Sequence, residues 1–183
     1  MVAVNTGITQ PSPIQRLSRV LAIACLFAML TSPIYTVWLW LAADPSTLVS
    51  EAKLSFVVRE PLLAWQRGAG MLAALLPVGC QIMGQWQARK CFQLFADGQI
   101  FIANAVHFLR RFAGWMIATI FAQSVSNALH SVVLSFGNPS GERMLTIELG
   151  VSWDSLLSII MVWVMAAVIG HGQALAEENA KFI

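Results

Sequence analysis

Charged residues are scarce in this chain, and their scarcity argues against an ordinary water-soluble domain. Only 11% of the 183 residues are Asp, Glu, Lys or Arg, whereas 57% are hydrophobic. Soluble domains carry about 25% charged residues, which supply much of the surface that faces water. A surface that faces lipid needs no such residues, so the composition indicates an integral membrane protein of the all-α class.

Motifs that carry chemistry are missing as well. The three cysteines, Cys25, Cys80 and Cys91, stand at unrelated spacings that fit neither a disulfide framework nor a zinc site. The sequence has no Ser-His-Asp order, no His-Glu-x-x-His and no glycine-rich phosphate loop. Its net charge of +2 gives no basis for nucleic-acid binding. We therefore expect no catalytic residues, no metal and no nucleic-acid partner.

Four long stretches of the chain contain no charged residue. They cover residues 20–43, 68–88, 112–141 and 155–176. A helix needs about 20 apolar residues to cross a hydrocarbon core ~30 Å thick. The sequence predicts a single membrane domain over residues 1–183, folded as a four-helix bundle. Its spans are expected at approximately 18–43, 66–88, 112–136 and 153–176.

The distribution of cations favours one orientation of these spans. An even number of spans places both termini on the same side, together with the loop between the second and third spans. This side would carry seven Lys and Arg residues, and the opposite side four. The positive-inside rule therefore predicts that both termini and the central loop are cytoplasmic.

Two turn signals are expected between the spans. Ala96-Asp97-Gly98 predicts a helix stop with Gly98 in the left-handed conformation, so the second and third helices form an extended cytoplasmic hairpin with its turn at 96–104. On the outer side, Asp44-Pro45 predicts a cap and the first turn of a short helix at the interface.

Four cations flank the predicted hairpin turn: Arg89, Lys90, Arg110 and Arg111. Cations beside a span commonly bind lipid headgroups, with about 1 kcal/mol for each one near anionic lipid. Docking of a soluble partner is the alternative interpretation. The sequence leaves both interpretations open.

A polar face runs along the third span. Its members recur at i, i+4, i+7 and i+8 and so share one side of a helix: Gln123, Asn127, His130 and Ser131. In lipid such groups must face protein or water. One interpretation is hydrogen bonding between helices, with Gln81 and Gln85 of the second span as partners. The other is a polar cavity or substrate path.

Small and aromatic residues give further packing signals. Ala166, Gly170 and Ala174 recur every four positions on the fourth span and permit close backbone approach, either within the chain or in a homo-oligomer. Most tryptophans lie near span ends, as interfacial rings do; Trp40, for example, closes the first span. Trp163 lies in the middle of a span, and helix packing is the only explanation that the sequence offers.

Histidine raises the question of haem. His107 and His171 are expected at similar depth on different spans, which is what bis-histidine ligation requires. Single histidines at helix ends are nevertheless common, and His130 has no mate in its part of the membrane. We expect no cofactor.

Two short segments resemble motifs of a known family. The first reads Gly98-Gln99-Ile100-Phe101, Asn104, Leu109-Arg110-Arg111 and Gly114. The second is the Glu177-Glu178-Asn179 tail, in which Ala180 and Lys181 depart from the pattern. In these motifs the chain resembles a bacterial four-span family catalogued as "domain of unknown function 2975". The resemblance implies the bacterial inner membrane and a regulatory role beside a small helix-turn-helix regulator. It defines no catalytic residues.

The sequence therefore favours a non-enzymatic accessory or regulatory protein of the lipid bilayer. Its expected partner is another membrane component, either a different protein or a second copy of the chain. The first alternative is a small transporter or channel-like protein that uses the polar face of the third span. The second is a haem-binding electron carrier.

Overall fold

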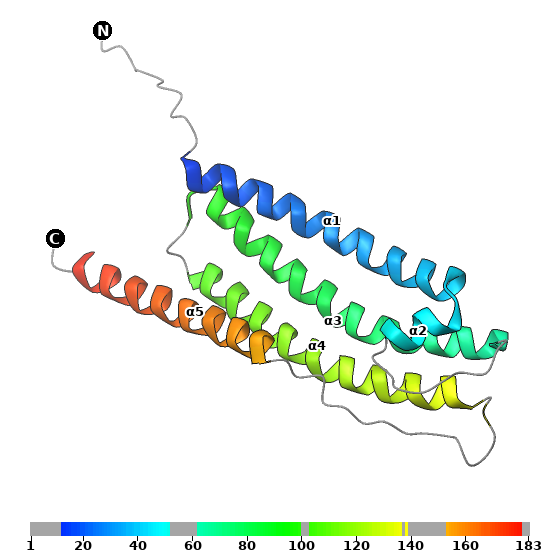
Figure 1. Cartoon of the computed structure of the whole chain (residues 1–183). Coiled ribbons are helices and arrows are strands. Elements are labelled where there is room, and N and C mark those ends of the chain that lie inside the picture. The colour runs from blue at the N-terminus through cyan, green and yellow to red at the C-terminus, as the bar shows by residue number, and fades with distance from the viewer. Residues whose placement is uncertain (1–11, 52–61, 100–102, 137, 139–152, 181–183) are drawn as a thin grey trace, which may run out of the picture.

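The structure is a computed structural model, and it describes residues 12–51, 62–99, 103–136, 138 and 153–180. Every regular element in this part of the chain is a helix (Figure 1). The helices are α1 (Pro13–Ala42), α2 (Pro45–Glu51), α3 (Ala64–Ala96), α4 (Ala103–Ser135) and α5 (Trp153–Ala180). The predicted all-α class is confirmed.

A capping box sets the start of α1. Ser12 Oγ accepts a hydrogen bond from the Gln15 backbone N–H at 3.3 Å, and Gln15 Oε1 accepts one from the Ser12 N–H at 2.9 Å. Pro13 follows at the first helical position, where its missing N–H costs nothing. These local contacts begin α1 at residue 13, ahead of the apolar stretch that predicted a span from residue 18.

The first part of the turn after α3, through Gln99, has the predicted geometry, and residues 100–102 of the predicted turn lie outside the described residues. Gly98 has φ 79°, in the left-handed region that favours glycine. The Gly98 N–H donates to Phe95 O at 3.1 Å, and the Gln99 N–H donates to Leu94 O at 2.9 Å. This is the hydrogen-bond pattern of a Schellman motif, which satisfies the last carbonyls of α3. The predicted conformation of Gly98 is confirmed, and α3 and α4 form an antiparallel hairpin.

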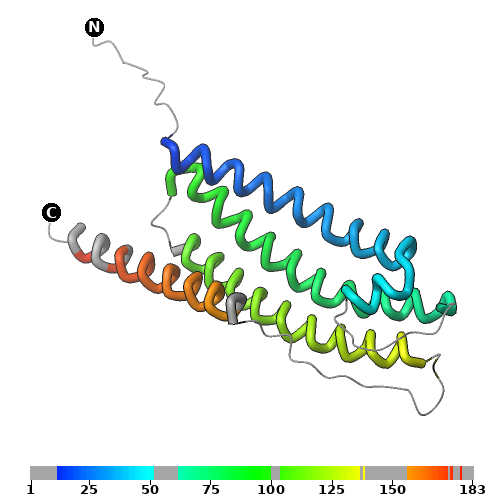
Figure 2. Tube along the Cα trace, viewed as in Figure 1, coloured from blue at the N-terminus to red at the C-terminus, as the bar shows by residue number. Residues whose placement is uncertain are grey.

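The long helices α1, α3 and α4 lie side by side in a row (Figure 2). α1 packs along α3, α3 packs along α4, and α5 packs against α4. α5 lies beside the part of α4 nearest the hairpin turn, since Gly170 faces Val106. In the described helices α5 does not close the row onto α1. A closed four-helix bundle therefore stays a prediction.

Three helices have the length and composition of membrane spans. They are α1, α3 and residues Asn104–Ser135 of α4. The apolar part of α5 that the structure describes, Leu156–Gly172, is shorter. The chain thus has the helices of a membrane protein, and the fourth predicted span is not established by length.

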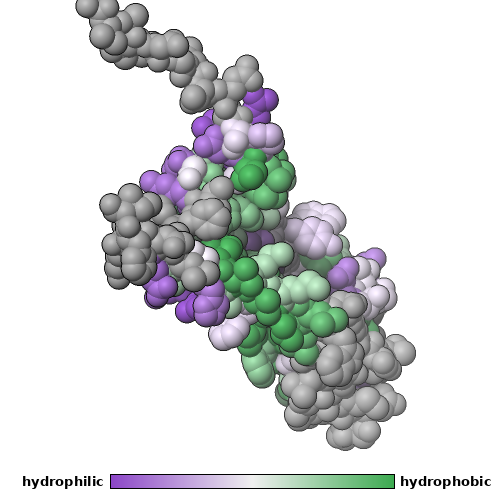
Figure 3. Space-filling model, turned by 90° about the vertical axis from the view of Figure 1, so that its left-hand side faces the viewer, coloured by the Kyte–Doolittle hydropathy of each residue, from purple (hydrophilic) through white to green (hydrophobic). Residues whose placement is uncertain are grey.

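The two ends of the molecule differ in what they carry. The start of α1, the α3–α4 turn and the end of α5 lie together at one end, which we call the hairpin end; α2 lies at the other, the α2 end (Figure 1). Figure 3 looks onto the hairpin end and shows hydrophilic surface gathered near the helix ends and hydrophobic surface along the helices beyond them. Polar helix ends and apolar helix sides are typical of helices that span a bilayer.

The short helix predicted after Asp44 is confirmed as α2. Its first N–H groups, those of Thr47 and Leu48, donate to Asp44 O at 3.0 and 3.2 Å. α2 folds back toward the long helices, because Leu48 and Val49 are buried in a cluster with Trp40 and Leu134. Trp40, expected at the interface as the last ring of the first span, is instead almost fully buried.

Candidate functional site

The polar face of α4 turns mostly toward the protein. Asn127, His130 and Ser131 are buried, whereas Gln123 is exposed. Gln123 Nε2 donates to Asn127 Oδ1 at 2.8 Å, and Ser131 Oγ donates to Ala128 O at 2.8 Å. Part of the polar face is therefore satisfied within α4 itself.

His130 joins three helices. Its Nε2 lies 2.9 Å from Gly70 O on α3, and its ring centroid lies 4.9 Å from that of Trp40 on α1. Gly70 lies directly against the Trp40 ring, so that an added Cβ would overlap it. The absence of a side chain at residue 70 lets the indole pack against the α3 backbone while the imidazole reaches the carbonyl beside it.

Two side chains at the start of α3 form hydrogen bonds to neighbouring helices at the α2 end. Gln66 Nε2 donates to Val133 O at 2.9 Å, which ties α3 to α4. Arg67 Nη1 donates to the carbonyls of Trp40, Leu41 and Ala43 at 3.1, 3.3 and 3.2 Å. The last carbonyls of a helix lack partners and carry partial negative charge, so the guanidinium caps α1.

Neither contact is predicted by the sequence patterns. Arg67 is one of the four cations predicted on the outer side, and Gln66 is the first residue of the predicted second span. The sequence does place an amide and a cation at the start of an apolar helix, and such groups need hydrogen-bond partners where water is scarce. This position indicates that Gln66 and Arg67 make contacts. Which carbonyls they reach depends on the tertiary arrangement.

A polar cavity of about 210 Å³ lies next to His130. α1 contributes Tyr35 to its lining, α2 contributes Glu51 and α3 contributes Gln81. α4 contributes five polar side chains: Thr119, Gln123, Ser126, Asn127 and His130. Three of the four residues on the predicted polar face therefore line one space, and Gln81 lines it as well.

Two buried polar atoms in this lining are unsatisfied. Ser126 Oγ and His130 Nδ1 have no hydrogen-bond partner among the described residues. A buried donor or acceptor without a partner costs about 1–3 kcal/mol. The cavity thus offers hydrogen-bonding capacity that a small polar molecule could use. Gln85, the other predicted partner, is not part of this lining, and its Oε1 is also buried without a partner in the described structure.

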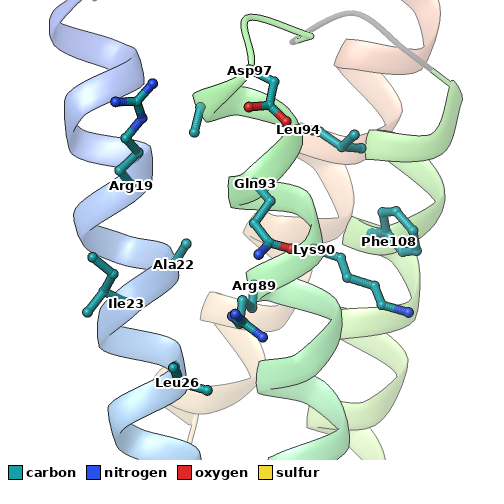
Figure 4. A pocket seen from close by; sticks show the side chains of 11 residues that line it. Arg19, Ala22, Ile23, Leu26, Arg89, Lys90, Gln93, Leu94, Asp97 and Phe108 are labelled. Carbon is teal, nitrogen blue, oxygen red and sulfur yellow. The ribbon is translucent and has the colours of Figure 1, made fainter.

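The four cations near the hairpin turn fall into two places. Arg89 and Lys90 lie on α3 in a bay beside α1, which Figure 4 shows from close by. The Arg89 guanidinium carbon is 5.8 Å from the Trp86 ring centroid, and Lys90 Nζ is 5.5 Å from it. Arg110 and Arg111 are exposed on α4 and border a separate, open groove with His107.

The small residues of α5 contribute unequally to packing. Ala166 is fully buried, and an added Cβ at Gly170 would lie 3.8 Å from Val106 Cγ1. Ala174 is exposed. The seam between α4 and α5 therefore uses the first two positions of the predicted repeat, and Ala174 lies outside it.

The histidines expected near the hairpin end are both exposed. His107 belongs to the first turns of α4, and His171 to the later turns of α5. Over the described residues no three His, Cys, Asp or Glu side chains gather as metal ligands would. Neither residue enters the polar cavity.

Comparison of the chain with protein-family models, with curated proteins and with solved structures gives no match. The resemblance to the four-span family therefore stays a prediction, and the site is interpreted from its own geometry.

Gly70→Ala is expected to lower the free energy of unfolding by about 1–3 kcal/mol, the usual cost of overpacking, because its Cβ overlaps the buried Trp40 ring. Unfolding of the purified protein in mixed micelles measures this change. Gly79→Ala is the matched control on the same helix, since no atom lies within 4 Å of the added Cβ. It should be neutral or stabilise by up to about 1 kcal/mol. Equal effects of the two substitutions would contradict the contact.

Proposed function

We propose that this chain is a non-enzymatic accessory or regulatory protein of the bacterial inner membrane that binds another membrane protein through α5. In this proposal α5 is the fourth span and packs beside the other helices in the bilayer. The observation that carries it is the exposure of Trp163 in the middle of an apolar helix that is attached to the rest of the protein along one seam.

α5 buries little of its apolar surface. Among its described side chains only Ile159 and Ala166 are buried, and the helix that α5 packs on is α4. The large apolar residues around the rest of the helix are exposed: Leu157, Ile160, Met161, Trp163, Val164, Met165 and Val168. Lipid can cover aliphatic side chains of this kind. It cannot satisfy a polar group among them.

Trp163 is that polar group. Its side chain is 58% exposed, and its indole N–H has no hydrogen-bond partner among the described residues. Tryptophan in a membrane protein favours the interface, where the N–H meets water or headgroups. Trp163 lies ten residues after the start of α5, far from both helix ends. A carbonyl or polar side chain of a second protein would supply the acceptor that hydrocarbon lacks.

The test places a photoreactive phenylalanine analogue at residue 163 in native membranes. We expect a covalent adduct of defined mass to another membrane protein, or to a second copy of the chain. The same analogue at Phe27, 69% exposed on α1, is the matched control and should label lipid alone. Trp163→Phe keeps an aromatic ring at this position but removes the indole N–H. It should weaken the association about threefold, the equivalent of about 0.6 kcal/mol. Lipid labelling alone at residue 163 would contradict the proposal.

The proposed orientation places the hairpin end in the cytoplasm. Six cations of the described helices lie toward that end: Arg16, Arg19, Arg89, Lys90, Arg110 and Arg111. This distribution supports the orientation through the positive-inside rule.

Cysteine labelling tests the orientation in a variant without Cys25, Cys80 and Cys91. Asn104→Cys, exposed at the start of α4, should react in intact cells only with a membrane-permeant reagent. Ser46→Cys, exposed on α2, should react with an impermeant reagent added outside. The reverse pattern would invert the orientation.

The polar cavity supports a second candidate function, passage of a small polar solute. Ser126 Oγ and His130 Nδ1 supply unsatisfied hydrogen-bonding atoms in its wall. Gln123 lines both this cavity and a groove between α4 and α5. Gln123 therefore lies at a position where a polar solute could pass between the cavity and the groove.

Glycerol or urea flux into proteoliposomes tests this second candidate. Asn127→Leu should reduce the flux to that of protein-free vesicles, because it replaces an amide of the cavity wall with an apolar group. Val125→Leu, on the exposed side of the same helix, should leave the flux unchanged. Wild-type flux no faster than through empty vesicles would exclude this function for these solutes.

A further inference from the structure

A basic bay lies at the hairpin end, on one face of the row of helices. α3 forms its floor, α1 forms one wall and Phe108 of α4 lies on the other side (Figure 4). Its volume is about 600 Å³. Arg89 and Lys90 extend from α3, with Lys90 directed toward Phe108 of α4, and Arg19 projects from α1.

Two of the three cations of the bay, Arg89 and Lys90, contact aromatic rings rather than carboxylates. Lys90 Nζ lies 5.5 Å from the Trp86 centroid and 5.5 Å from the Phe108 centroid. The Arg89 guanidinium approaches the same Trp86 ring. Adjacent positive charges repel each other, and stacking on a ring restricts their side chains without neutralising them.

One described carboxylate borders the bay, and it leaves the charge unbalanced. Asp97 lies near the hairpin turn, away from Arg89, and forms no ion pair with the three cations (Figure 4). Three cations and one anion leave an excess of two positive charges. The bay is therefore electrostatically complementary to a doubly negative ligand.

We propose that the bay binds the phosphate groups of an anionic phospholipid, with preference for a headgroup that carries two negative charges. Arg19 and Arg89 bind phosphate oxygens from α1 and α3, and Lys90 adds a point charge from the floor. Guanidinium groups suit phosphate because their N–H groups match its oxygens in pairs. Basic pockets between transmembrane helices bind such headgroups in other membrane proteins.

The apolar part of the bay identifies the ligand as lipid rather than free phosphate. Ile23 and Leu26 of α1 line the side that leads away from the hairpin turn (Figure 4). Beyond Arg89 on α3, Trp86 and Met83 are exposed and continue the apolar surface along the helix. Acyl chains would cover these side chains, whereas a soluble anion would leave them bare. This inference is independent of what α5 binds.

Native mass spectrometry of the full-length protein in detergent tests the proposal. The protein is titrated separately with cardiolipin, phosphatidylglycerol and phosphatidylcholine of matched acyl chains. We expect the dissociation constant to rise in that order, by about tenfold between cardiolipin and phosphatidylcholine, since one charge-assisted hydrogen bond is worth about that factor. Millimolar inorganic phosphate should not displace bound cardiolipin.

Charge-removing variants locate the site. Arg89→Gln and Arg19→Gln should each weaken cardiolipin binding about tenfold. Arg19 is exposed, so its variant tests the bay even where Arg89→Gln fails to fold. Arg16→Gln is the matched control on α1, outside the bay, and should change binding by less than about twofold. Equal affinity for phosphatidylcholine, displacement by free phosphate, or an equal effect of Arg16→Gln would overturn the proposal.

Discussion

The contact between Trp40 and Gly70 is the constraint on which the arrangement at the α2 end depends. Because residue 70 has no side chain, the indole lies against the backbone of α3, and α1 approaches closely. His130 forms a hydrogen bond to the backbone carbonyl of Gly70, which brings α4 close to this contact as well. The buried indole is also what α2 packs against through Leu48 and Val49. The polar cavity lies beside this junction and takes part of its wall from Trp40 and His130.

Polar groups in these apolar helices are handled in three different ways. Three hydroxyl groups donate hydrogen bonds to backbone carbonyls one turn earlier on their own helices: those of Thr31, Thr36 and Thr119. Gln66 and Arg67 instead bond to carbonyls of neighbouring helices and so fix helix positions. Ser126 and His130 Nδ1 follow neither course, since they remain unsatisfied at the cavity wall. Most polar groups of such helices have partners within the protein, and two of the exceptions, Ser126 Oγ and His130 Nδ1, lie together in the wall of one cavity.

Features set by local chemistry could be predicted from the sequence. The left-handed Gly98, the helix after Asp44 and the shared face of Asn127 and His130 depend on neighbours within a few residues. Trp40 could not be placed, because residue spacing puts it near a span end and gives no indication that Gly70 lies opposite. The cavity likewise needs the relative heights of α1, α3 and α4. Axial register between helices is decided by tertiary contacts such as those of Gln66 and Arg67, and it leaves no periodic signal in any one helix.

The row of helices has a consequence for biogenesis. Each long helix packs on the long helix that precedes it in the chain: α3 on α1, α4 on α3 and α5 on α4. The contacts of each long helix with its predecessor can therefore form in the order of synthesis. Assembly by neighbouring segments keeps loop closure short, which favours rapid folding and limits the time during which a polar face such as that of α4 lacks its partners.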